Sequence, residues 1–166
     1  MTDDPVTRLE YLIRTDLLAE MGGDPSGELS TKSFASLLII YANWRQRFIS
    51  QHPREAHLSI GLSSGPNYEP HADAVAAIVT AIEAGTDLTP HLSRGIRNSY
   101  TAIADRSSQN NRRRDLDLLI SEWGIHHLHL STSMDADGFV TRSENLLFAK
   151  FSPDDAYIIG VFPHGS

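Results

Sequence analysis

The stretch Trp123-Gly124-Ile125-His126-His127-Leu128-His129-Leu130-Ser131 decides the fold of this chain. Before Gly124, apolar residues recur every three or four positions, which is typical of helices, and after it they alternate with other residues. This change of period predicts that a strand begins directly after Gly124. Because a strand sends alternate side chains to opposite faces, His127 and His129 should share one face and His126 should lie on the other.

Three strands are predicted in the C-terminal part of the chain: Ile125–Ser131, Leu146–Phe151 and Ala156–Phe162. Turn-forming residues separate them, and the four-residue link Ser152–Asp155 fits a hairpin between the last two strands. We therefore predict a small antiparallel sheet of three or more strands over about residues 124–166.

The residues before this sheet predict about five helices from their apolar periodicity and their start and stop signals. These helices span residues 5–21, about 30–51, 70–84, a short segment from Thr89 through Arg97, and about 112–122. Residues 53–70 are expected to form a loop with a short extended piece at 57–62. Helices over about 1–123 followed by a sheet over about 124–166 predict an α+β fold in a single domain of 166 residues.

Composition removes several classes of protein. The chain has no cysteine, so disulfides, thiolate metal sites and a cysteine nucleophile are excluded. Neither of the glycine-rich phosphate-binding motifs is present, so no nucleotide cofactor is indicated, and we predict no cofactor. The N-terminus lacks a secretory pattern, and the longest apolar run, Leu37–Ala42, is too short to cross a bilayer. We expect a cytoplasmic protein without a membrane partner.

The charge is distributed unevenly along the chain. The net charge is −7, which disfavours general nucleic-acid binding, yet six of the 14 basic residues fall within residues 94–114. Six arginines against one acid give this window a net charge of +5. Arginine suits phosphate through its planar fork of donors, so the window is a candidate RNA-binding segment. Its members are Arg94, Arg97, Arg106, Arg112, Arg113 and Arg114.

Histidines of the predicted sheet are the candidate catalytic residues. RNA cleavage without metal needs a base for the 2′-hydroxyl, an acid for the leaving oxygen and a cation for the phosphorane charge. His127, His129 and His164 can supply the acid and base, and Arg142 and Lys150 can supply the cation. The nearby arginine window would then position the RNA backbone. The sequence therefore predicts an endoribonuclease that requires no metal.

This layout is similar in outline to RelE-like and barnase-like ribonuclease toxins, in which helices precede a small antiparallel sheet with basic and imidazole groups on its open face. The likeness concerns architecture alone. It implies an RNA substrate, a toxin or antiviral-defence context, and a neutralising protein partner.

Two alternatives remain open. The same three histidines, with Asp135 or Asp137, could hold a metal ion in a metal-dependent enzyme. The acidic bulk, the helical part and the arginine window could instead form the docking surface of a non-catalytic interaction protein.

A further Arg–His pair stands near the end of the second predicted helix. Arg47 and His52 have a spacing that looks like the Arg/His pair of HEPN ribonucleases, which would imply an all-helical dimeric enzyme. The predicted sheet is foreign to that fold. Arginine and histidine at a helix end also fit a capping role.

Overall fold

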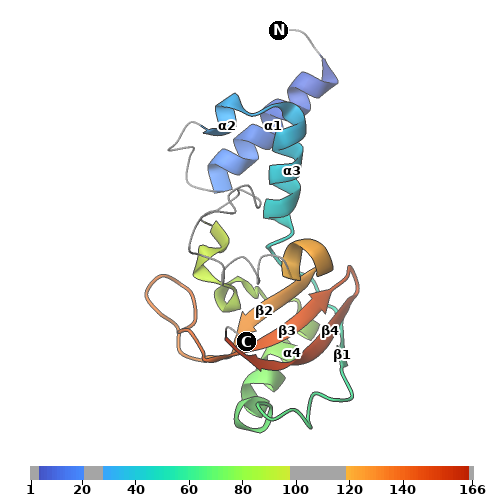
Figure 1. The fold of residues 1–166 in the computed structure, drawn as a ribbon, viewed down its shortest axis with the longest axis vertical. Helices are drawn as coiled ribbons and strands as arrows, with labels where there is room; N and C mark the ends of the chain where they lie inside the picture. Colours follow the sequence, from blue (N-terminus) through green and yellow to red (C-terminus); the bar gives the residue numbers. More distant parts are fainter. Residues whose placement is uncertain (1–3, 21–27, 98–118, 165–166) are drawn as a thin grey trace.

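The computed structural model describes residues 4–20, 28–97 and 119–164. Figure 1 shows helices α1, α2 and α3 grouped at one end and the sheet at the other, with α4 behind the sheet. The α-helices are α1 (Pro5–Glu20), α2 (Glu28–Thr31), α3 (Phe34–Arg45) and α4 (Ala72–Ala84), and the 3-10 helices are η1 (Glu69–His71), η2 (Thr89–His91) and η3 (Arg94–Arg97). The strands are β1 (Glu55–Leu58), β2 (Ile125–His129), β3 (Asn145–Phe151) and β4 (Asp155–Pro163).

The α+β class is confirmed, but the sheet is mixed and not antiparallel as predicted. Its order is β1-β4-β3-β2, with β2/β3 and β3/β4 antiparallel and β1 parallel to β4. The parallel strand comes from the predicted loop 53–70, where Glu55 lies opposite Asp155. Four residues are too few to show a period, and their partner lies 100 positions along the chain. Local pattern indicated a short extended piece at 57–62, which overlaps the end of β1, but it gave no sign of this pairing.

The helices also differ from the prediction. Four α-helices have described bounds where about five were predicted, and the segment from Thr89 to Arg97 forms η2 and η3 instead of one helix. The predicted helix 30–51 is divided into α2 and α3, because the Ser33 hydroxyl caps a new start by accepting from the Ser36 amide at 3.3 Å. Of the last predicted helix, residues 119–123 are helical and the preceding part lies outside the described residues.

Two apolar clusters hold the molecule together. The larger packs one face of the sheet, the inner face, against α4 through residues such as Val75, Ile78 and Leu147. The smaller joins α1, α2 and α3 around Leu17 and Trp44. The half-buried ring of Phe48 packs against both clusters and connects them. The other face of the sheet, called the outer face below, is not part of either cluster.

Within the described ranges, no helix combines the length and the apolar character needed to cross a bilayer.

Candidate functional site

Strand β2 places two of its three histidines on the outer face. His127 lies opposite Phe148, and His129 lies opposite Leu146. Opposed residues of neighbouring strands share a face. His126 turns to the inner face, where its ring meets Phe151 edge-on and its Nε2 lies 3.0 Å from a backbone carbonyl of the loop after α3. The predicted alternation of the three histidines is therefore confirmed.

Five rings form a connected series on the outer face, which we call the ring chain. The centroid distances are 6.2 Å for His164–His129, 6.5 Å for His129–His127, 6.4 Å for His127–Phe148 and 5.4 Å for Phe148–Phe162. His127 and His129 are only 8% and 4% exposed, whereas Phe162 is 45% exposed and His164 is also exposed. The ring chain thus has a buried middle and two ends that solvent or a ligand can reach.

Burial keeps the two central imidazoles neutral. Burial, with smaller contributions from the positive charges that His129 and His164 can carry, lowers the pKa of His127 from an ordinary value of 6.5 to about 4. Burial likewise lowers the pKa of His129 to about 4, assisted first by His164 and then by Arg142. Both rings are therefore uncharged at neutral pH.

Ser143 places both a hydrogen-bond donor and a hydrogen-bond acceptor beside Nδ1 of His129. Its backbone N–H donates to Nδ1 at 3.3 Å, and its Oγ lies 3.4 Å from the same atom. The hydroxyl hydrogen is committed to the carbonyl of Asn145 at 2.5 Å, and the Leu130 amide donates to Oγ at 3.0 Å. One lone pair of Oγ remains. Ser143 can therefore partner the neutral ring through its amide and the protonated ring through its hydroxyl.

His127 is less well satisfied. Its Nδ1 is fully buried and finds no hydrogen-bond partner among the described residues. An unpaired buried nitrogen is costly to retain, and such atoms are uncommon in folded proteins.

The two predicted catalytic cations lie in different places. Arg142 is exposed, and its charge is one of those that lower the pKa of His129, so it belongs to the His129–His164 end of the ring chain. Lys150 lies opposite Ile125 and Tyr157. That position is four residues along β3 from Leu146, or about 13 Å at strand spacing. Lys150 is thus separated from His129.

Of the arginine window, only Arg94 has a described side chain. It forms ion pairs with Asp135 and, through Nε at 3.2 Å, with Asp137. Asp135 also accepts from the Thr141 hydroxyl at 3.0 Å, which together with Arg94 lowers the pKa of the carboxyl group. Arg94 therefore braces the β2–β3 connection. The side chain of Arg97 and all of Arg106, Arg112, Arg113 and Arg114 lie outside the described residues.

The alternative metal site is not formed by the histidines proposed for it. Across the described residues, the only three-residue group whose donor atoms all lie within 4.8 Å of one another is Glu55, His57 and Asp155. His127, His129 and His164 do not form such a group, and Asp135 and Asp137 are engaged by Arg94.

Sequence reasoning missed the residues of β1. Glu55 and His57 alternate on this strand, and His57 stacks on Tyr157 of β4 with centroids 5.1 Å apart. It also missed the buried Arg54, whose guanidinium donates to Ser50 and Ser152. The sequence does show an acid and a histidine two positions apart, but only the pairing with β4 brings Asp155 next to them.

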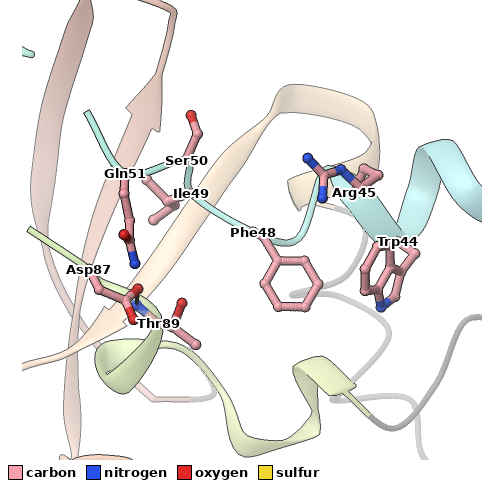
Figure 2. A pocket seen from close by; sticks show the side chains of 8 residues that line it. All are labelled: Trp44, Arg45, Phe48, Ile49, Ser50, Gln51, Asp87 and Thr89. Carbon is pink, nitrogen blue, oxygen red and sulfur yellow. Dashed lines mark hydrogen bonds between the residues drawn. The ribbon is translucent and has the colours of Figure 1, made fainter. Parts of the chain in front are cut away.

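A hollow of about 220 Å³ lies between the end of α3 and the turn before η2, and no histidine is among its lining residues. Figure 2 shows the side chains that line it. Trp44 and Phe48 form one side, and Gln51 and Asp87 face them. The Asp87 carboxylate accepts from the Thr89 amide at 2.9 Å, which is a turn-forming role.

Helix α3 ends at Arg45, so neither Arg47 nor His52 lies on it, and the His52 ring contacts the carbonyl of Pro153. A comparison of this chain with protein-family models, curated proteins and solved structures finds no match in any of the three.

Proposed function

We propose that this protein is an endoribonuclease that binds single-stranded RNA on the outer face of its sheet and cleaves it beside His129 and His164 without a metal ion. The observation that carries the proposal is the ring chain, in which a buried neutral imidazole stacks at 6.2 Å on an exposed one beside the exposed Arg142.

Two features of the outer face favour a single strand. Phe162 and Tyr157 are 45% and 46% exposed on the same side of the sheet as the histidines. Exposed aromatic rings stack on unpaired bases, which a duplex does not offer. Lys150 lies opposite Tyr157 and supplies a cation for the phosphate backbone of the bound RNA.

The chemistry assigns a role to each group at the His129 end. His164 takes the proton of the 2′-hydroxyl, the 2′-oxygen bonds to phosphorus, and the bond from phosphorus to the 5′-oxygen breaks. Protonated His129 gives its proton to that 5′-oxygen, and Arg142 stabilises the negative charge of the phosphorane. The products are a 2′,3′-cyclic phosphate and a 5′-hydroxyl.

His129 gains its catalytic proton when substrate binds. Its pKa is about 4 in the free protein, so it is neutral at pH 7. A phosphate placed beside it replaces surrounding positive charge with negative charge and raises that pKa. The free lone pair of Ser143 Oγ then accepts from the new Nδ1–H.

The biological setting that we propose is a toxin or antiviral-defence module whose activity a protein partner neutralises. Small ribonucleases require such control because they act on the RNA of the cell that makes them.

The test is incubation of the purified chain with end-labelled single-stranded RNA in a chelator. We expect cleavage with cyclic-phosphate ends, and a loss of about 10²–10⁴-fold in kcat for His164→Ala. The matched control is His57→Ala, which removes an imidazole from the opposite edge of the sheet and should leave kcat unchanged. Uncut RNA across a range of salt and pH would remove the proposal.

The two cations provide a second contrast. Arg142→Ala should lower kcat about 10²–10³-fold, as loss of a transition-state donor does. Lys150→Ala should raise KM and reduce the salt dependence of binding while leaving kcat unchanged. Equal effects of the two variants would contradict the assigned roles.

A second candidate, a protein-interaction domain, is favoured by the exposed apolar side chains of the helical end. Val6, Leu9 and Leu12 recur every three residues on α1, and Leu38 and Ile39 are exposed on α3. Pull-down with Leu9→Glu/Leu12→Glu as the comparison separates this role from catalysis, because these exposed residues lie on α1, at the opposite end of the molecule from the sheet that carries the histidines (Figure 1).

A further inference from the structure

Strands β1 and β4 bring an imidazole and two carboxylates together at one edge of the sheet. The parallel register sets Glu55 opposite Asp155 and His57 opposite Tyr157. Because alternate residues of a strand share a face, Glu55 and His57 lie on the same face of the sheet. The donor atoms of Glu55, His57 and Asp155 all lie within 4.8 Å of one another, and Nε2 of His57 is 2.7 Å from Oδ1 of Asp155.

Neighbouring groups hold two of these side chains in place. The ring of Tyr157 stacks on the His57 imidazole with an interplanar angle of 24°. The Ser152 hydroxyl lies 3.3 Å from Oδ2 of Asp155, which leaves Oδ1 directed at His57. Such outer contacts orient ligands in metal sites and fix the tautomer of a ligating histidine.

The charge of this group is uncompensated by cationic side chains. Within the described residues, neither Glu55 nor Asp155 forms an ion pair with lysine or arginine, and His57 is the one ion-pair partner of Asp155. The two carboxylates carry a formal charge of −2, which a divalent cation balances.

The spacing also suits a metal ion. Bonds of about 2.1 Å at tetrahedral or octahedral angles set adjacent ligand atoms about 3.0–3.4 Å apart. The His57–Asp155 separation of 2.7 Å is close to this value, and Glu55 reaches it by a change of rotamer on the exposed edge. One nitrogen and two oxygens favour Zn²⁺ over Mg²⁺ or Ca²⁺, which prefer oxygen alone.

We propose that Glu55, His57 and Asp155 bind one Zn²⁺ ion, with water in the remaining position. The ion joins the four-residue edge strand β1 to β4 and so stabilises the folded chain. This site stands apart from the ring chain and does not depend on the ribonuclease activity proposed above.

The experiment is calorimetric titration of the chelator-treated full chain with Zn²⁺ at pH 7.5, combined with thermal unfolding with and without the ion. We expect one tight site per chain and a rise in Tm that grows with Zn²⁺ concentration. His57→Gln and Asp155→Asn should each weaken that binding at least tenfold and abolish the rise in Tm.

The chain has eight histidines, so the control must test adventitious binding. His164→Gln removes the most exposed imidazole of the ring chain and should keep the tight site. Glu55→Gln is the second ligand variant, and circular dichroism without metal shows whether each variant folds. The proposal is overturned if no tight site appears, if His57→Gln binds as the parent does, or if His164→Gln removes the site.

Discussion

Ser143 lies against Nδ1 of His129 with its backbone N–H at 3.3 Å and its hydroxyl oxygen at 3.4 Å. One residue thus offers this imidazole a donor for its neutral form and an acceptor for its protonated form. The hydroxyl also accepts from the Leu130 amide at the end of β2 and donates to the first residue of β3. Ser143 is therefore a positioning residue for the candidate catalytic histidine.

Ser143→Ala should lower cleavage without removing it. The amide contact to His129 persists, but the protonated ring loses its acceptor, so we expect kcat to fall about tenfold or more, with the optimum displaced to lower pH. The free energy of unfolding should fall by about 1–2 kcal/mol, because the buried Leu130 amide loses its partner. A pH–rate profile separates the two effects, since a purely structural role would leave its shape unchanged. Ser64→Ala, at an exposed turn, is the control.

Lowering the pH should begin to destabilise the protein at a pH well above the range in which carboxylates usually titrate. The pKa of His127 and of His129 is about 4 in the folded chain against an ordinary value of 6.5, so the unfolded chain binds more protons between these limits. Stability is then complete above pH 6.5, falls as the pH drops, and reaches its full loss below about 4. The difference corresponds to at most about 3 kcal/mol per histidine.

Urea unfolding at pH 7.5, 6, 5 and 4.5 measures this loss. His127→Phe removes one of the titrating rings next to Phe148 and should flatten the pH dependence. A free energy of unfolding that is constant from pH 7.5 to 4.5 would show that these imidazoles are not held neutral by burial.

Gly85 ends α4 in a conformation that other residues adopt poorly. Its φ is +69°, and a Cβ there would lie 2.5 Å from the backbone nitrogen of Pro53. Gly85→Ala should therefore cost about 2–4 kcal/mol of stability, through the backbone clash as well as the left-handed strain. Gly138→Ala is the matched control, since φ is +82° but nothing lies within 4 Å. It should cost about 1 kcal/mol. Equal Tm losses in the two variants would contradict the close approach.

The features that were predicted correctly from the sequence are those that depend on residues close together in the chain. The change of period at Gly124 located β2, the alternation separated His126 from His127 and His129, and the predicted helix 70–84 ends at the same residue as α4. What failed in the sheet depends on pairing over about 100 residues. Strand β1 is too short to show a period, and both the mixed sheet and the Glu55 group exist only because β4 lies beside it.

The sequence also did not show that the two candidate catalytic cations, Arg142 and Lys150, lie in different parts of the outer face. Arg142 and Lys150 have the same charge and lie near the same strand, so sequence reasoning predicted the same role for both. The register places Lys150 beside Tyr157, whereas the charge of Arg142 acts on His129. The basic character of residues 94–114 likewise did not reveal that Arg94 is engaged by Asp135.

Arg54 should prove the most sensitive cation for stability. It is 7% exposed, and its guanidinium donates to the Ser50 carbonyl at 2.9 Å, the Ser50 hydroxyl at 2.7 Å and the Ser152 carbonyl at 2.9 Å. It also lies 5.5 Å over the ring of Phe151. These contacts fasten the segment before β1 to the β3–β4 turn.

Arg54→Met keeps much of the apolar contact but leaves the acceptors unpaired, so we expect the free energy of unfolding to fall by about 2–4 kcal/mol. Arg8→Met, at an exposed position of α1, should change stability by less than about 0.5 kcal/mol. Hydrogen exchange should then show the amides of Glu55 and Ser59, which bond to β4 and the turn before it, exchanging faster in Arg54→Met alone. Unchanged protection at these amides would mean that β1 stays paired without the arginine.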